Sequence, residues 1–403
     1  MRYLVIIFSA FLLFSCTNNQ TKVLQKGTYR AVLIAQDNQE MPFTFEVINS
    51  EKINIYNAKE IIEVDEISYS NDSVRIQVPV YEGYIVAKIE ENKLNGSFIK
   101  ESVDRIVPFK AYLSNKRFSN NKKAAKNITG NWETVFSPNS DKDKYIAKGI
   151  FKQVANKVTG TFRTTTGDYR YLEGIVVGDS LKLSTFDGAH AFLFTAKITD
   201  STLIGNFYSG NHWKEPFIAK LNNNYKLPNE DNLTYIKKGY DKFAFSFPDE
   251  NRKMVSLSDK RFQNKVVLVQ IMGTWCPNCL DESKYYVNYL KEHPNTDIEI
   301  VALAFEVAKT KEIAFERIRR LRNRIEITYP VLLAQFGNLA DKKLAQEKLP
   351  MLNHILSYPT TVFIDKKGEV RKIHTGFNGP ATGKKYIDFK RDFKQFINTL
   401  LKE

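Results

Sequence analysis

The alternation of hydrophobic and polar positions divides the chain into two parts with different secondary structure. Between residues 27 and 222, short runs such as 75–78 and 182–184 alternate with a period of two, and Asn, Asp and Gly separate them. This period is typical of strands that bury one face, and no convincing amphipathic helix interrupts it. The pattern predicts an all-β region built from antiparallel strands.

The β-rich region also contains an internal repeat. Four pairs of short segments share residues in the same order and at similar offsets: 27–29 with 130–132, 72–74 with 179–181, 94–98 with 203–207, and 108–111 with 216–219. The repeat predicts two related β units, residues 27–115 and 127–222. One large barrel or sandwich formed from both halves is the alternative architecture.

From residue 243 the pattern changes to alternating strands and helices. Residues 223–242 are polar and rich in turn-forming residues, which is typical of a linker. The pattern then predicts strands at 266–271, 298–305 and 329–333, helices at 278–291, 313–324 and 389–401, and a hairpin formed by 360–364 and 369–374. This alternation predicts an α/β domain over residues 243–403.

The N-terminus has the pattern of an export signal. Residues 1–15 combine a charged start with an apolar run too short for a confident membrane span. The end of this run resembles a bacterial lipoprotein signal, which implies that Cys16 is lipidated and that residues 16–26 form a tether. A plain cleaved signal with a chance cysteine is the alternative. We expect a protein of the cell envelope, lipid-anchored and facing the periplasm, in either the inner or the outer membrane.

The composition is that of a folded protein without a nucleic-acid partner. Of the 403 residues, 43% are hydrophobic, which is enough for two or three cores. The net charge of +14 arises from 59 basic and 45 acidic residues dispersed along the chain, without a basic block interleaved with aromatics. Five arginines between residues 317 and 324 stand among apolar residues at helical spacing, which favours a solvated helix face over a binding patch.

Cysteine usage points to redox chemistry at one place. The chain has three cysteines, and if Cys16 carries lipid, Cys276 and Cys279 are the only possible redox pair. Two cysteines separated by two residues at a helix N-terminus can close a disulfide within one turn. The unpaired N–H groups and the dipole of that helix end favour a thiolate, so Cys276 is the predicted nucleophile. Cys279, one turn further in, would resolve the mixed disulfide.

The residues beside the cysteines fit this interpretation. Pro277 suits the first helical position, because its missing N–H costs nothing there. Trp275 is expected to flank the nucleophile, and Trp275 and Pro277 are both expected to contact the substrate. A zinc site would need four ligands, and the five histidines are scattered, so no metal is expected. An inert structural disulfide remains a further alternative.

The segment 266–282, which contains Cys276-Pro277-Asn278-Cys279, resembles the active-site segment of the TlpA/ResA family of membrane-tethered thioredoxin-like proteins. The resemblance extends over roughly residues 243–403 and implies a thioredoxin-like fold. It also implies that Tyr358, Pro359 and Thr360 form a cis-proline loop, which lies against the disulfide and contacts the substrate. Glu282 matches the family's acidic residue near the second cysteine, which implies proton handling for Cys279; an ordinary first-turn glutamate is the alternative.

Some positions depart from related proteins. Gln270 stands where thioredoxin keeps a buried acid, and Lys284 replaces a proline that is common in the family. Val269 and Gly273 stand where peroxiredoxins place Pro and Thr, which disfavours direct peroxide reduction. His374 follows the predicted hairpin and could approach the site, but a lone histidine there is more often structural.

The sequence therefore predicts a thiol-disulfide oxidoreductase, a reductase or isomerase, that acts on protein disulfides with no cofactor other than the Cys276–Cys279 pair. The resemblance implies an inner-membrane electron donor protein and substrates that include cytochrome c apoproteins. The alternative is a binding scaffold whose thioredoxin fold is redox-inactive. Its binding surface would use aromatic and histidine residues of the β region: Trp132, Tyr169, Tyr171, His212 and Trp213.

Overall fold

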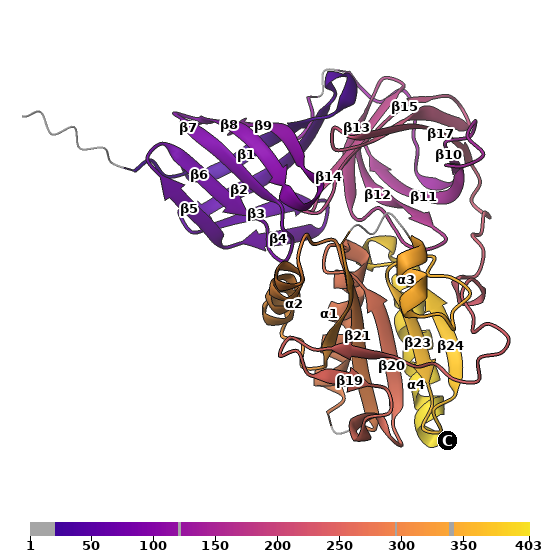
Figure 1. Ribbon diagram of the computed structural model, residues 1–403. Helices are drawn as coiled ribbons and strands as arrows, with labels where there is room; N and C mark the ends of the chain where they lie inside the picture. Colours follow the sequence, from indigo (N-terminus) through magenta and orange to yellow (C-terminus); the bar gives the residue numbers. More distant parts are fainter. Residues whose placement is uncertain (1–20, 120–121, 295, 338–341) are drawn as a thin grey trace, which may run out of the picture.

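The computed structural model describes residues 21–119, 122–294, 296–337 and 342–403. Two β units lie side by side, and a C-terminal α/β domain packs beneath both of them (Figure 1). The predicted order of an all-β region followed by an α/β domain is confirmed. In the described part of the chain, no helix has the length and apolar character needed to cross a membrane.

The first β unit is a nine-stranded antiparallel sheet with the order β4-β3-β2-β1-β9-β8-β7-β6-β5. Its strands alternate as predicted: in β9, Val107, Phe109 and Ala111 are buried and the residues between them are exposed. The strands are β1 (Gly27–Ile34), β2 (Glu40–Asn49), β3 (Lys52–Asn57), β4 (Glu60–Val64), β5 (Glu66–Ser70), β6 (Ser73–Gln77), β7 (Tyr84–Glu90), β8 (Lys93–Lys100) and β9 (Arg105–Leu113).

The second β unit is a closed barrel whose last strand pairs with its first. Stacked and edge-on phenylalanines fill it, including Phe136, Phe162 and Phe194. The strands are β10 (Gly130–Phe136), β11 (Tyr145–Val154), β12 (Lys157–Thr164), β13 (Leu172–Val177), β14 (Ser180–Phe186), β15 (Ala191–Ile198), β16 (Thr202–Ser209) and β17 (Trp213–Leu221).

The strand registers support the predicted repeat. Gly96 pairs with Phe109 in the first unit, and the corresponding Gly205 pairs with Phe217 in the second. The two units therefore form separate bodies, which disfavours the alternative of one large barrel. The strands β4 and β5, separated only by Asp65, take the place of the single strand β13.

The α/β domain has a five-stranded sheet with the order β22-β21-β20-β23-β24. All seven residues of the central strand β20 are buried, because helices and loops cover both faces of the sheet. Its elements are β18 (Ser246–Pro248), β19 (Met254–Ser256), β20 (Val266–Met272), α1 (Pro277–Glu292), β21 (Ile298–Glu306), α2 (Lys311–Ile325), β22 (Val331–Phe336), α3 (Lys342–Lys348), β23 (Thr360–Ile364), β24 (Val370–Thr375) and α4 (Lys384–Lys402). Two helices differ from the prediction: α4 begins at Lys384 instead of residue 389, and α3 was not predicted.

Part of the predicted linker packs along the α/β domain. The backbone N–H of Lys237 donates to Met351 O at 2.8 Å, and that of Asn353 donates to Tyr235 O at 3.0 Å. Asp231 lies 2.6 Å from His374 Nδ1. His374 therefore has a structural partner, which agrees with the structural interpretation of this histidine.

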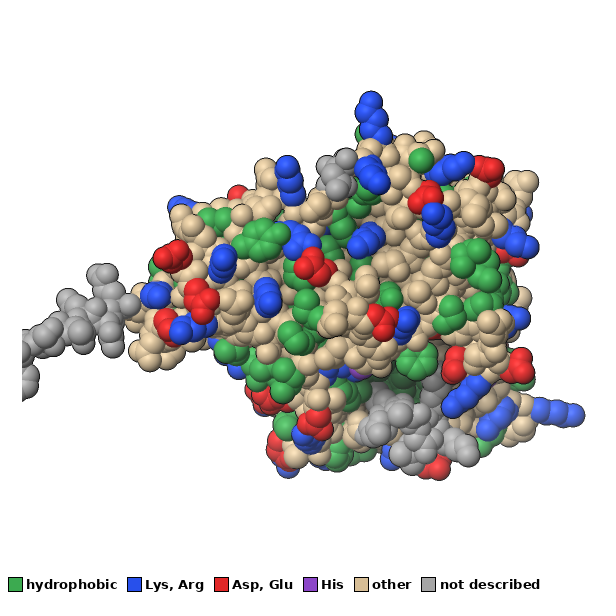
Figure 2. All heavy atoms as spheres, turned by 90° about the horizontal axis from the view of Figure 1, so that it is seen from above, with side chains coloured by type: hydrophobic (Ala, Val, Ile, Leu, Met, Phe, Trp, Pro, Cys, Tyr) green, Lys and Arg blue, Asp and Glu red, His purple; other side chains and the backbone are tan. Residues whose placement is uncertain are grey.

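The solvated-face interpretation is wrong for three of the five α2 arginines, whereas Arg319 is exposed as predicted. Arg317 pairs with Glu82, Arg320 with Glu66 and Arg324 with Asp65, at 2.5, 2.8 and 2.7 Å. The first β unit presents a row of carboxylates to this helix, so the arginines dock one body on the other. On the outer face of the molecule seen in Figure 2, Lys and Arg are scattered among Asp and Glu without a basic patch.

Candidate active site

The two cysteines lie where strand β20 feeds the N-terminus of α1. Cys276 is the N-cap of the helix, and its Sγ accepts the backbone N–H of Cys279 at 3.2 Å. Pro277 occupies the first turn, as predicted. The sulfur of Cys276 thus lies at the end of the helix where unpaired N–H groups favour negative charge.

Both cysteines are free thiols, and they differ in how much of each side chain is exposed. Cys279 is fully buried, and Cys276 keeps 6% of its surface exposed. Burial raises the pKa of the Cys279 thiol well above its ordinary value, and the neighbouring Cys276 raises it further. Cys279 is therefore held as the neutral thiol, and Cys276 is the member of the pair that an incoming group can reach.

The predicted cis-proline loop lies directly against Cys276. The Tyr358–Pro359 peptide is cis, as the resemblance implied, and the Cys276 thiol donates to Tyr358 O at 3.4 Å. The Tyr358 ring meets Trp275 edge-on, with ring centroids 5.6 Å apart. Trp275 and Tyr358 are partly exposed, whereas Pro277, Pro359 and Thr360 are buried. Of the five predicted substrate contacts, only these two aromatic side chains are open to a ligand in this conformation.

Glu282 is a fully buried carboxyl one turn after Cys279 on the same face of α1. It accepts hydrogen bonds from Gln270 Nε2 at 2.8 Å and from the hydroxyls of Tyr286 and Thr361 at 3.0 Å. Burial raises its pKa to about 7. Position 270 carries a glutamine where thioredoxin has a buried acid. Here Glu282 of helix α1 provides a buried carboxyl beside that position.

A second buried carboxyl, Glu306 at the end of β21, was missed by sequence reasoning. It accepts the backbone N–H of Thr274 at 2.8 Å and the Thr274 hydroxyl at 2.5 Å. Burial raises its pKa to about 7. It fixes the loop that leads into the cysteines, and the signal in the sequence is an acidic residue that ends an apolar strand.

The loop between β12 and β13 of the barrel covers the cysteine site, a contact that the sequence did not predict. Thr166 O accepts the Phe377 N–H at 3.3 Å and the Ser357 hydroxyl at 3.4 Å, beside the cis-proline. Asp168 O accepts from Asn278 Nδ2, inside the CPNC motif, at 3.4 Å. The barrel therefore touches both the helix end and the loop that frame Cys276.

Arg170 in the same loop joins all three bodies through a buried ion cluster. Its guanidinium pairs with Glu60 of the first β unit, with Asp187 of the barrel at 3.7 Å, and with Asp281 of α1. Arg170, Asp187 and Asp281 are each less than 10% exposed. Removing one partner of such a cluster leaves uncompensated charge, so it holds the bodies in one arrangement.

A turn of the first β unit lies over the same region. The Tyr81 N–H donates to Pro79 O at 2.8 Å, which leaves Val80 at φ 71° in a tight γ-turn. Positive φ is strained for a β-branched residue. The turn places buried Tyr81 near Arg170 and Cys276; burial above all raises its pKa well above the ordinary value, and the neighbouring acidic groups add to this.

The aromatic residues proposed as a binding surface separate into two groups. Trp132 is buried in the barrel core, so it offers no surface. Trp213 is 42% exposed and lies with Tyr169 and His212 around a cavity between the bodies. Within the described ranges, no group of three or more His, Cys, Asp or Glu side chains is arranged to hold a metal.

Comparisons with known proteins concern the C-terminal part of the chain. Residues 240–373 match the AhpC/TSA family. The chain is 28% identical to the thioredoxin-like protein YneN of Bacillus subtilis over 141 residues, which are 35% of this chain and 73% of the relative. It is 26% identical to the thiol-disulfide oxidoreductase ResA of Halalkalibacterium halodurans over 133 residues, 33% of this chain and 66% of the relative.

Solved structures also resemble this part. A thiol-disulfide oxidoreductase of Bacteroides fragilis has 18% identity and a TM-score of 0.27, covering 37% of this chain and 98% of the other. A thioredoxin-family thiol:disulfide interchange protein of Chlorobium tepidum has 19% identity and a TM-score of 0.30, covering 41% and 99%. From the family match and the curated relatives, the C-terminal region is a thioredoxin-like domain of the AhpC/TSA type, related to the thiol-disulfide oxidoreductase ResA and to the thioredoxin-like protein YneN.

Proposed function

We propose that this protein exchanges thiols for disulfides with protein substrates, as a reductase or an isomerase, with Cys276 as the nucleophile. The observation that carries the proposal is the position of its sulfur. It accepts the Cys279 N–H at the start of α1 and lies 3.4 Å from the carbonyl of the residue before the cis-proline. A thiolate there is stabilised by the helix end, and the loop carbonyl lies where a substrate backbone would be held.

The proposed reaction has two steps. The Cys276 thiolate attacks one sulfur of the substrate disulfide, the substrate S–S bond breaks, and the departing substrate sulfur takes up a proton. The Cys279 thiolate then attacks Cys276 in the mixed disulfide and releases the second substrate thiol. The substrate gains two electrons and two protons, and the protein is left with the Cys276–Cys279 disulfide. A dithiol donor must reduce this disulfide before the next turnover.

Proton removal from Cys279 requires a general base, because burial raises the pKa of this thiol. Glu282 lies one turn away with a pKa of about 7, so at neutral pH its carboxylate form is well populated. We assign Glu282 the role of accepting the Cys279 proton. The hydrogen bonds from Gln270 and Thr361 orient this carboxyl.

The expectations for location and partners follow as part of the proposal. The lipid anchor at Cys16, and with it a periplasm-facing location, falls outside the described residues. A membrane-held protein donor of electrons would suit an anchored reductase. The reaction needs no cofactor beyond the cysteine pair.

The scaffold alternative is favoured by one observation, the low exposure of Cys276 beneath the barrel loop. Insulin reduction by wild type and by Cys276→Ala, at equal concentration with dithiothreitol as donor, separates the two functions. Because dithiothreitol reduces insulin slowly by itself, the enzyme proposal expects the insulin B chain to precipitate faster with wild type than with Cys276→Ala, which should match dithiothreitol alone. Equal rates for the two proteins would support the scaffold.

A further inference from the structure

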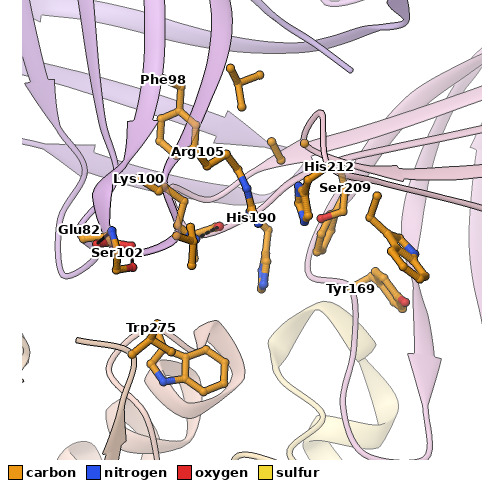
Figure 3. Close-up of a pocket in the computed structure, with 18 of the residues that line it drawn as sticks. Glu82, Phe98, Lys100, Ser102, Arg105, Tyr169, His190, Ser209, His212 and Trp275 are labelled. Atoms are coloured by element: carbon orange, nitrogen blue, oxygen red, sulfur yellow. Dashed lines mark hydrogen bonds between the residues drawn. The ribbon is translucent and has the colours of Figure 1, made fainter. Parts of the chain in front are cut away.

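A cavity of about 430 Å³ opens where the two β units meet the thioredoxin-like domain. Its walls come from all three bodies: β8 and β9 of the first unit, the strands and turns around β15 and β16 of the barrel, and Trp275 beside the nucleophile. Figure 3 shows the side chains of the β units on one side and Trp275 facing them from the other. The cavity therefore exists only in the assembled protein.

One side of the cavity is basic. Lys100 and Arg105 line it together with two histidines, His190 and His212 (Figure 3), and His190 Nδ1 lies 3.5 Å from Asp187. Among the residues that the structure describes, Lys100 Nζ donates to one acceptor, Ala189 O, at 3.1 Å. The guanidinium of Arg105 makes no hydrogen bond or ion pair with any residue that the structure describes. Burial above all, together with the charges of Arg105 and Lys100, lowers the pKa of His212 to about 4.

Glu82 is the acidic residue in the wall, and its negative charge favours the charged forms of Lys100 and Arg105. Its carboxylate accepts from Ser102 and pairs directly with Arg317 at 2.5 Å. A cation without a direct ion pair in a partly buried place attracts an anionic ligand group.

The remaining wall is aromatic. Phe98, Phe192 and Phe207 are buried in it, and Trp213 and Trp275 present partly exposed rings. Ring faces pack against apolar side chains, whereas the guanidinium donates hydrogen bonds to a carboxylate. Trp275 directly precedes Cys276, so one wall of the cavity is formed by the residue next to the attacking cysteine.

We propose that this cavity binds the substrate next to its disulfide and selects an acidic residue adjacent to an aromatic one. The site deepens the proposed function, on which it rests. Arg105 is the specificity-determining residue: its charge holds the substrate carboxylate, and Trp213 and Trp275 hold the neighbouring ring.

Binding can be measured without any redox step. Three peptides in which serine replaces cysteine, Ser-Phe-Glu, Ser-Phe-Gln and Ser-Phe-Lys within one neutral decapeptide, are titrated against the full chain by tryptophan fluorescence at low salt. We expect the Glu peptide to bind roughly five- to tenfold more tightly than the Gln peptide, with the Lys peptide weakest. Arg105→Gln should bring the Glu and Gln peptides within a factor of two. Lys110→Gln, which removes an exposed cation from the same strand, should keep the preference.

The absence of any preference among the peptides in wild type, or an unchanged preference in Arg105→Gln, would overturn the site. A loss of preference in Lys110→Gln equal to that in Arg105→Gln would also overturn it, because net charge alone would then explain binding. The same peptides with cysteine, linked as mixed disulfides to thionitrobenzoate, test the proposed function separately through release of the chromophore. Peptide selectivity without chromophore release would contradict the enzyme and support the binding site.

Discussion

Arg170, in the barrel loop between β12 and β13, forms a buried ion pair with Asp281, which lies two residues after Cys279 in α1. Their side chains are 6% and 8% exposed. Because α1 carries both cysteines, this pair ties the cover of the active site to the helix that performs the proposed chemistry. The reactivity of Cys276 should therefore depend on residues that the sequence places more than 100 positions away.

Replacing Arg170 with Met should both loosen the cover and destabilise the protein. Glu60, Asp187 and Asp281 would lose their shared cation, and stranded buried charges cost about 3–5 kcal/mol. We expect a lower urea midpoint and faster alkylation of Cys276 by a bulky maleimide. Arg391→Met removes an exposed arginine of α4, 63% accessible, and should change stability by less than about 1 kcal/mol. If Arg170→Met and Arg391→Met had the same urea midpoint and the same rate of Cys276 alkylation, the ion cluster would not hold the bodies together.

Gly376 tests the contact between the barrel loop and the cis-proline region. Its φ is 82°, and a Cβ there would lie 2.0 Å from Thr166 O. Gly376→Ala should therefore push the loop away and speed alkylation of Cys276. Gly368 has nearly the same φ, 84°, with nothing within 4 Å of its Cβ position. Gly368→Ala should lower the free energy of unfolding by about 1–2 kcal/mol through backbone strain alone, and Cys276 should be alkylated as slowly as in wild type. Equal alkylation rates in the two variants would contradict the cover.

Glu282 should make stability depend on pH. Its pKa is raised from 4.5 in the unfolded chain to about 7 in the fold. Between these values the folded state keeps a proton that the unfolded chain releases, so the free energy of unfolding falls as pH rises from 4.5 through 7. The loss is complete above the folded pKa and amounts to the order of 3 kcal/mol.

Glu282→Gln cannot ionise. The free energy of unfolding of this variant minus that of wild type should therefore be about 2–3 kcal/mol larger at pH 8 than at pH 4.5. Urea unfolding at the two pH values measures this. Glu316→Gln, at an exposed position of α2, should keep the wild-type pH slope. A Glu282→Gln slope as steep as that of wild type would show that this carboxyl does not carry a shifted proton.

Local sequence patterns were sufficient for most of the elements and for the cysteine pair. The period-two alternation of the β region, seen in β9, and the apolar run at 266–271 within β20 could be recognised because each depends on neighbouring residues. Cys276 and Cys279 could be placed at a helix start because spacing and the adjacent proline determine that geometry. The repeat also carried register information, since Gly96 and Gly205 occupy matching positions opposite Phe109 and Phe217.

The contacts between bodies could not be predicted in the same way. Nothing local to Arg170 indicates that Glu60 and Asp281 will be its partners, and the α2 arginines have the same spacing as an ordinary solvated helix face. Glu282 was a candidate by resemblance, but its link to Gln270 needed the helix and the strand to be packed together. Charge pairs across a domain interface depend on tertiary arrangement, which one sequence alone does not specify.

The most direct test of the proposed chemistry is to trap the mixed disulfide. The Cys279→Ser variant, incubated with a peptide that contains one disulfide, is analysed by intact-mass spectrometry and then by peptide mapping under non-reducing conditions. We predict one adduct, located on Cys276 and released by dithiothreitol, and no adduct when Cys276→Ser is combined with Cys279→Ser. A Cys279→Ser protein that stays unmodified while wild type reduces the peptide, or an adduct that persists without Cys276, would contradict the assignment of Cys276 as the nucleophile.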